Sequence, residues 1–455
     1  MELKRLSQAR FNALCYSRQP PAAFMSREVE WWADPDERIL GLVPLDTTDK
    51  DWAWIVLGRD EKALFRAINI DASIKTQVEA SERLREQLQK YALSGESEFP
   101  QHDTDQKKNT LLVPVVRDEK LHRNFKILME EEHHSPARAI IREIAYAFVD
   151  VDGNYAKDFQ TTGFNSRLWE LFLFVFLYEQ KFFVPREFDR PDFCALKFGF
   201  PVAIEAVTVN PTDGEEPPSP ETPEEAHELR QNYMPIKFGS ALYSKLNKRY
   251  WELPHVKGVP FIIAIHDFHG SDSMTWSAPA IEDYLYGVRA SWKKDEQGTL
   301  DVTETPITEH EWKGKRIPSG FFNLPDAENV SAVLFSNSAT LSKFNRMAKL
   351  AGFGNREVMI FRVGNIHNPD PNATEPLPFK AEVTPGKYSE NWSEGVRVFH
   401  NPRALIPIPD DLFEGCSQHF FEKGRRVAIL PRNFIYASKT FLFAPGDQDP
   451  KQPDV

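Results

Sequence analysis

Three carboxylates near the middle of the chain carry the clearest chemical signal in the sequence. They are Glu170, Asp192 and Glu205, and each lies at a place where a metal-dependent nuclease would need an acid. Hydrolysis of a phosphodiester requires a divalent cation to hold the phosphate, lower the pKa of the attacking water and neutralise the leaving oxyanion. Carboxylate oxygens are ligands that Mg²⁺ prefers. The three residues therefore predict a metal site suited to phosphodiester hydrolysis.

Two of the acids fall on neighbouring extended segments. Glu205 lies in the β-branched and apolar run 202–209, which predicts a fully buried central strand. An unpaired carboxylate there is costly to bury, and a divalent cation relieves that cost most naturally. Asp192 opens the extended run 192–198 and is 13 residues before Glu205, a spacing that suits one hairpin with both acids at the same end. The alternative for Asp192 alone is a turn residue that bonds nearby backbone.

The third acid belongs to a predicted helix. Glu170 lies in the stretch 164–178, which is long enough for a helix and mostly too apolar to face water. Its large apolar neighbours bury that helix, so the carboxylate is expected to point into a cleft. The alternative is an ion pair with Arg167, three residues earlier on the same helix, worth roughly a few tenths of a kcal/mol.

This pattern resembles the PD-(D/E)XK nuclease superfamily. The resemblance rests on Glu170, on Pro191–Asp192 at a strand start and on Glu205–Ala206–Val207 in the next strand, and it covers residues 162–364. It implies an α/β fold with a restriction-endonuclease-like αβββαβ core. It also implies that Asp192, Glu205 and the backbone carbonyl of Ala206 bind Mg²⁺ or Mn²⁺, with Glu170 completing the shell directly or through water.

One position departs from the family pattern. Val207 stands where the family has a lysine two residues after the second carboxylate, and valine can neither orient water nor stabilise charge. A helix expected over 240–251 follows this strand and carries Lys245 and Lys248 on one face. Lys245 is the predicted catalytic lysine, displaced to this helix, and Lys248 is the other candidate. The alternative is that both lysines form, with Arg249, a solvated face that contacts phosphate.

The 455 residues exceed what one core usually supports, so several domains are expected. We predict an N-terminal α+β accessory domain over 1–155, the nuclease-like core over 156–365, and a loop-rich C-terminal extension over 366–455 that ends in a disordered tail from Gly446. In the first domain, an antiparallel sheet and a charged amphipathic helix are predicted at 28–32, 39–43, 52–57, 63–68 and 72–91.

The predicted core alternates strands with helices. The strands are expected at 181–184, 192–198, 202–209, 260–265, 331–335 and 358–363, and further helices at 278–286 and 339–350. The acidic, proline-rich segment 210–234 predicts a mobile loop. His266 and His269 end one strand, where an auxiliary role near the metal is a further hypothesis.

Composition narrows the function classes. A net charge of -12 argues against nucleic-acid binding by bulk charge, so such binding requires a local basic surface and a metal. Three widely spaced cysteines argue against a disulfide framework or a structural zinc site. The N-terminus lacks the apolar stretch of a secretory signal and no segment resembles a membrane span, so a cytoplasmic protein is expected.

Together these observations predict a Mg²⁺-dependent nuclease that cuts nucleic acid, DNA in preference to RNA. The resemblance implies a restriction or anti-phage defence effector, acting as a homodimer or with a defence-system partner protein. The alternative is a catalytically inactive nuclease-fold subunit that binds nucleic acid or assembles a complex. Val207 is the main support for that alternative.

Overall fold

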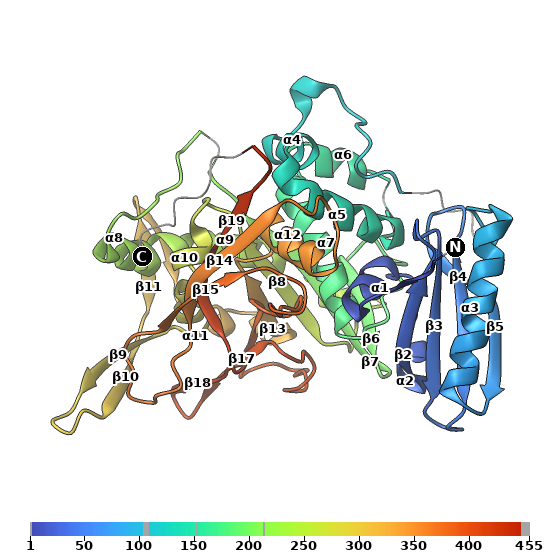
Figure 1. The fold of residues 1–455 in the computed structure, drawn as a ribbon. Coiled ribbons are helices and arrows are strands. Elements are labelled where there is room, and N and C mark those ends of the chain that lie inside the picture. The colour runs from blue at the N-terminus through green and yellow to red at the C-terminus, as the bar shows by residue number, and fades with distance from the viewer. Residues whose placement is uncertain (1, 103–108, 152, 213, 447–455) are drawn as a thin grey trace.

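The protein is a mixed α/β structure with several sheets (Figure 1). The computed structural model describes residues 2–102, 109–151, 153–212 and 214–446. A five-stranded sheet lies at the N-terminal end, a seven-stranded sheet forms the centre, and a three-stranded sheet packs beside it. Among the described residues, no helix has the length and apolar character needed to cross a bilayer.

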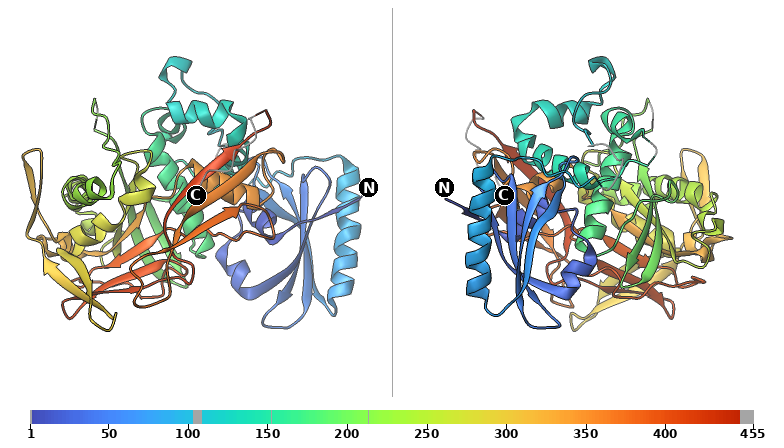
Figure 2. Two further views of the ribbon diagram at one scale, coloured as in Figure 1. Left: turned by 60° about the vertical axis from the view of Figure 1, so that its left-hand side comes forward. Right: turned by 90° about the vertical axis from the view of Figure 1, so that its right-hand side faces the viewer.

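The N-terminal sheet is antiparallel, as predicted. Its order is β1-β2-β3-β4-β5, and its strands are Lys4–Arg5, Ser26–Ala33, Ile39–Asp46, Trp52–Arg59 and Phe65–Ile74. The helix α3 (Gln77–Ser94) covers the outer face of this sheet (Figure 2), with Leu84 and Leu88 fully buried against it. Thr76 caps the helix by accepting a hydrogen bond from the N–H of Glu79. The short helices α1 (Gln8–Leu14) and α2 (Pro20–Met25) connect the first two strands.

A group of helices lies between the N-terminal sheet and the central sheet. It contains α4 (Arg123–Glu130), α5 (Ser135–Ala147), α6 (Tyr155–Gln160) and α7 (Phe164–Glu179). Helix α7 is buried on nearly all sides because its residues are apolar around the whole circumference. Trp169 anchors it to the central sheet by donating a hydrogen bond from Nε1 to the carbonyl of Ala264 at 3.0 Å.

The central sheet has the order β18-β17-β16-β13-β8-β7-β6. The strands are β6 (Phe193–Lys197), β7 (Phe200–Val209), β8 (Phe261–Asp267), β13 (Val330–Ser336), β16 (Arg397–His400), β17 (Ser417–Glu422) and β18 (Arg425–Ile429). β6 and β7 form an antiparallel hairpin, whereas β7, β8 and β13 run parallel. The strand expected at 181–184 is only a single bridge between Phe183 and Leu196. Parallel strands require crossovers, which the intervening helices provide.

The helices that follow β7 differ from the prediction at their ends. They are α8 (Pro223–Gln231), α9 (Tyr233–Leu246), α10 (Ser273–Trp276), α11 (Pro279–Tyr286) and α12 (Leu341–Leu350). The segment expected as a loop over 210–234 therefore contains a helix. Helix α9 begins seven residues earlier than expected because Pro235 lies in its first turn, where proline is tolerated. It ends before Lys248, since Arg249 has a left-handed φ of 52°.

The region after residue 365 is not a separate extension, because its strands belong to two sheets of the core. Its strands β16, β17 and β18 continue the central sheet, so the expected boundary at 365/366 separates parts of one sheet. The strand expected at 358–363 belongs to a different sheet, β15-β14-β19, made by Leu377–Glu382, Met359–Ile366 and Ile435–Phe443. Two hairpins project from the core, β9–β10 (Val288–Lys294, Leu300–Pro306) and β11–β12 (Glu309–Trp312, Lys315–Pro318). The tail predicted to be disordered lies outside the described residues after Gly446.

Candidate active site

The edge of the central sheet at the start of β6 brings two of the predicted acids together. Phe193 pairs with Ile204, so the chain enters β6 beside Glu205. The side chain of Asp192 accepts a hydrogen bond from the N–H of Ala206 at Oδ2, 2.7 Å away. The N–H of Asp192 donates in turn to Oε2 of Glu205 at 3.3 Å. The hairpin therefore fixes both carboxylates at one end of adjacent strands.

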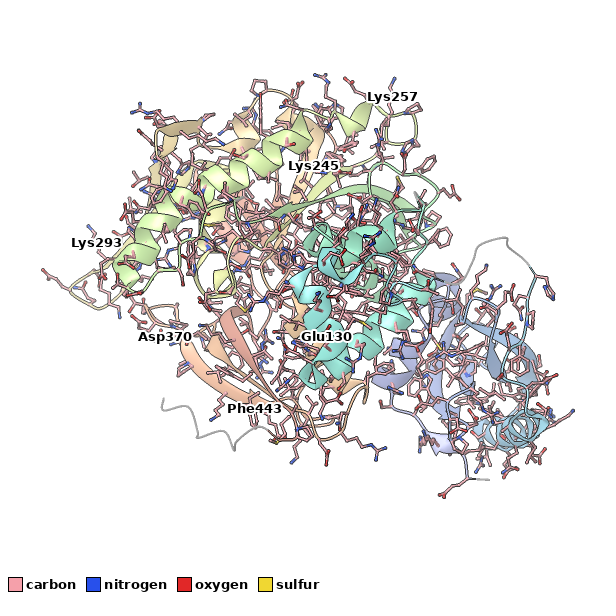
Figure 3. All side chains as sticks on the ribbon, turned by 90° about the horizontal axis from the view of Figure 1, so that it is seen from above. Glu130, Lys245, Lys257, Lys293, Asp370 and Phe443 are labelled. Carbon is pink, nitrogen blue, oxygen red and sulfur yellow. The ribbon has the colours of Figure 1, made fainter. Side chains whose placement is uncertain are left out.

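Glu205 also receives two donors from the segment after β7. Nζ of Lys245 lies 2.5 Å from Oε1 of Glu205, and the hydroxyl of Tyr250 donates to the same oxygen at 2.9 Å. Lys245 is near the end of α9 (Figure 3), and its helix packs on the face of the sheet that contains Val207. The Glu205 side chain is only 6% exposed, whereas that of Lys245 is 24% exposed. A cation and an acid are thus paired at the rim of the core.

Glu170 reaches the same region from the opposite side of the sheet edge. Nη1 of Arg167 donates to both of its carboxylate oxygens, at 3.1 and 3.2 Å, so the alternative ion pair exists. Arg167 also binds Asp158 through Nη2 at 2.7 Å. Glu170 and Asp192 nevertheless line one small cavity of about 30 Å³, together with Arg167 and Arg186. The ion pair and the cleft are therefore both features of the site.

Electrostatic repulsion links the three acids. Burial raises the pKa of Asp192 well above its usual value, and the charges of Glu170 and Glu205 raise it further. Burial also raises the pKa of Glu170, and the Arg167 guanidinium opposes that increase. Among the described residues, the Asp192 carboxylate has no cation within ion-pair distance, and the hydrogen bond that it accepts comes from the Ala206 N–H. The site therefore holds a carboxylate whose negative charge the protein leaves largely unneutralised.

The acids do not converge on one point as ligands of a metal would. Within the described ranges, no group of three or more His, Cys, Asp or Glu side chains is arranged to hold a metal ion. The reason is visible in the contacts: Glu205 is directed at Lys245 and Tyr250, and Asp192 at the N–H of Ala206. The donor chemistry suits Mg²⁺, since clustered carboxylates with raised pKa values are those that a divalent cation would relieve.

The predicted site residues are therefore brought together to different degrees. Asp192, Glu205 and Lys245 form one connected group, and Ala206 enters it through its N–H, whereas the predicted ligand atom was its carbonyl oxygen. Glu170 joins through the shared cavity. Lys248 is exposed beyond the end of α9, so it does not share the helical face of Lys245 as expected.

No hydrogen bond or ion pair among the described residues joins His266 or His269 to Glu170, Asp192 or Glu205, so the structure does not support their auxiliary role. His266 and Asp267 point to opposite faces of β8, where His266 accepts from the N–H of Ala339 and Asp267 pairs with His269 at 2.7 Å. Burial lowers the pKa of His266 to about 3, so its ring is neutral. These side chains belong to the packing on either face of the sheet, away from the carboxylates.

Two site residues were missed in the sequence. Tyr250 lies in a 3-10 turn, Tyr250–Glu252, which returns the chain toward β7 after α9 has ended. Arg186 donates from Nη1 to the carbonyl of Asp192 at 3.0 Å, and its guanidinium stacks on Phe148 at 4.2 Å. Neither carries a local signal, because each reaches the site through a turn whose direction only the folded chain defines.

Comparisons with models of protein families, with curated proteins and with solved structures each found no match. The residues themselves therefore carry the functional argument.

Proposed function

We propose that this chain is a divalent-cation-dependent nuclease of the PD-(D/E)XK type. The observation that carries the proposal is the 2.5 Å contact between Lys245 and Glu205, on the strand beside Asp192. Val207 stands where the family pattern has its lysine, and a lysine from α9 lies beside the second carboxylate instead. A solvated helical face would not direct an ammonium at a buried acid.

The order of elements supports the same proposal. Helix α7 is followed by the single bridge at Phe183, the hairpin β6–β7, the additional helix α8, helix α9 and the parallel strand β8. This order supports the proposed α-β-β-β-α-β core, in which the first strand would be reduced to one bridge. Asp192 immediately precedes β6 and Glu205 lies in β7, which are the positions that the resemblance implies for the two acids.

The chain's own residues would have separate tasks in this reaction. A cation held by Asp192 and Glu205, with Glu170 nearby, would polarise the scissile phosphate and lower the pKa of the attacking water. Lys245 places its side-chain nitrogen beside Glu205, where it can orient water and stabilise charge that develops on the phosphate. Arg167 and Arg186 supply further positive charge at the cavity that Glu170 and Asp192 line.

The direct test is cleavage by two alanine variants, Asp192→Ala and Glu205→Ala. Purified protein is incubated with linear DNA, single-stranded DNA and RNA of the same sequence, each with Mg²⁺ and with Mn²⁺. We expect the unmodified chain to cut at least one substrate only when the cation is present. Both variants should be inactive while unfolding cooperatively like the unmodified chain, and cleavage that survives in both would overturn the assignment.

A second function is favoured by one specific observation. All three acids have protein donors, and no metal-binding group is formed within the described residues. This arrangement suits a nuclease-fold subunit that binds nucleic acid without cutting it. Such a subunit would show no cleavage of any substrate with either cation, while binding DNA or RNA with an affinity that falls as salt rises.

A further inference from the structure

A second cavity, distant in sequence from the carboxylates, is lined by two arginines that lack an acidic partner. It has a volume of about 220 Å³, and its lining includes Arg230, Trp276, Arg397 and Tyr436. Arg230 is near the end of α8, whereas Arg397 begins β16 in the central sheet. Figure 1 shows that α8, α10, β14 and β19 lie on the same side of the molecule, and α10 contacts β19.

Arg397 is the most informative of these side chains. It is 9% exposed, and within the described residues its guanidinium makes no hydrogen bond or ion pair, although it lies over the ring of Phe434 at 5.0 Å. Its side chain lines the cavity. A buried charge without a partner is expensive, and burial lowers the pKa of Arg397. The protein thus maintains an unneutralised cation at the cavity wall.

Arg230 adds a second charge to the same wall. It is half-buried, burial lowers its pKa as well, and the described part of the chain offers it no ion pair. The carboxylate of Asp283 attracts Arg230 through space without forming an ion pair with it. Asp283 instead binds Arg426 at 2.8 Å and Arg289 at 3.3 Å.

The acid that faces Arg397 is likewise engaged elsewhere. Glu282 interacts with Arg397 only through space, and it pairs with His419 at 3.0 Å and with Arg426 at 3.6 Å. The acids around the cavity are therefore matched by other cations, and the two arginines of the wall are in excess.

We infer that this cavity is a binding site for the phosphate group of a small molecule. Two guanidinium groups present many N–H donors in planar forks that match phosphate oxygens, and their combined charge suits a dianion better than a single carboxylate. Ala278 and Pro279 at the start of α11 complete the wall beside the two arginines. Trp276 and Tyr436 provide aromatic surface for the part of the ligand beyond the phosphate.

Calorimetric titration of the full chain can test this inference without reference to cleavage. The probes are inorganic phosphate, adenosine 5′-monophosphate and adenosine, all without divalent cation. We expect the two phosphate-bearing probes to bind and adenosine not to bind. Tighter binding of the monophosphate than of phosphate identifies a phosphate ester as the ligand, and equal binding identifies free phosphate. Failure of both phosphate-bearing probes to bind at millimolar concentration overturns the inference.

Matched variants place the binding at this cavity. Arg230→Gln and Arg397→Gln should each weaken phosphate binding by at least tenfold, whereas Arg425→Gln, which removes an exposed arginine, should leave it unchanged. Phosphate should also raise the melting temperature of the unmodified chain but not of Arg397→Gln. Because Arg397 is buried with no acid beside it among the described residues, and its guanidinium lies over the Phe434 ring at 5.0 Å, its replacement should change the melting temperature little in the absence of phosphate. Unchanged affinity in both cavity variants would place any binding elsewhere and contradict the inference.

Discussion

Two clusters of buried charged residues in this molecule differ in their ratio of acids to cations, and that ratio determines whether the pKa of the buried acid is lowered or raised. In the first, Lys343, Arg346 and Arg362 surround Glu390, whose side chain is 0% exposed. In the second, the proposed active site, three acids share one sheet edge, and Asp192 has no ion pair among the described residues. Both clusters are buried, but only the second has an acid left without a cation.

The pKa directions follow that ratio. Burial raises the pKa of Glu390, but attraction to Arg346, Lys343 and Arg362 outweighs burial and holds the pKa well below its usual value. At the sheet edge, burial and repulsion act in the same direction, and the pKa of Asp192 is raised well above its usual value. A cluster that neutralises its acid stabilises the fold. A cluster that leaves an acid unneutralised costs stability and is the expected form of a functional site.

Breaking the neutralised cluster should have the largest effect on stability. Glu390→Gln leaves Lys343, Arg346 and Arg362 buried without their shared acid, at a cost of about 3–5 kcal/mol. The check is the free energy of unfolding at neutral pH from urea titration. Glu422→Gln, at an exposed acid, is the matched control and should change stability by less than about 0.5 kcal/mol. A small loss in Glu390→Gln would mean that the cluster is not the source of stability described above.

The free energy of unfolding should depend differently on pH in the unmodified chain and in Glu390→Gln. Because the folded-state pKa of Glu390 is lowered, its contribution is fully present above the unfolded-state pKa of about 4.5 and is lost as pH falls through the folded-state value. The stability difference between the unmodified chain and Glu390→Gln should therefore stay constant from pH 7 to about 5 and shrink below that. Urea midpoints measured across this range give the difference directly. A difference that grows in acid would reverse the sign of the argument.

At the proposed active site, the sharpest kinetic comparison is between two lysines. Lys245→Met removes the ammonium that lies 2.5 Å from Glu205 and should lower the cleavage rate by about 100-fold with little change in substrate affinity. Lys248→Met, at an exposed lysine beyond the helix, is the control and should leave the rate unchanged. Its effect, if any, should be weaker binding with a flatter salt dependence. Equal rates in both variants would contradict the displaced-lysine hypothesis.

Much of this comparison could be predicted from local sequence. The run 202–209 is strand β7 almost to the residue, because β-branched residues in a continuous row fit a buried strand. The packing of the helix that carries Lys245 against the sheet was also predictable, since a helix that connects two parallel strands must pack back across the sheet. The N-terminal antiparallel sheet followed from alternating strands with clear turn residues between them.

The remaining features depend on contacts between distant segments. β16 is only four residues, Arg397–His400, and its place beside β13 has no signature in its own composition. The hydroxyl of Tyr250 meets Glu205 only because Arg249 adopts a left-handed conformation that turns the chain back. The inward direction of Glu205, toward a lysine and a tyrosine, likewise could not be read from spacing. Local periodicity therefore defined the strands, and long-range packing defined which groups the acids face.

The smallest predicted effect is also the one that most directly measures an unneutralised acid. Asp192→Asn keeps an oxygen that can accept from the N–H of Ala206 while removing the charge that Glu170 and Glu205 repel. Without divalent cation, this variant should be more stable than the unmodified chain by about 1 kcal/mol at neutral pH. Urea unfolding in the presence of a chelator provides the measurement.

The ionised Asp192 carboxylate affects stability with the opposite pH dependence to that of Glu390, because its folded-state pKa is raised and that of Glu390 is lowered. Since the folded-state pKa of Asp192 is raised, the unmodified chain is favoured while that carboxyl is protonated, and it loses stability as pH rises from the unfolded-state value of about 3.8 through the folded-state pKa. The advantage of Asp192→Asn should therefore be near zero in acid and increase toward neutral pH. A variant that is less stable at neutral pH would show that Asp192 is a structural acid, since its charge would then be neutralised by the protein as that of Glu390 is.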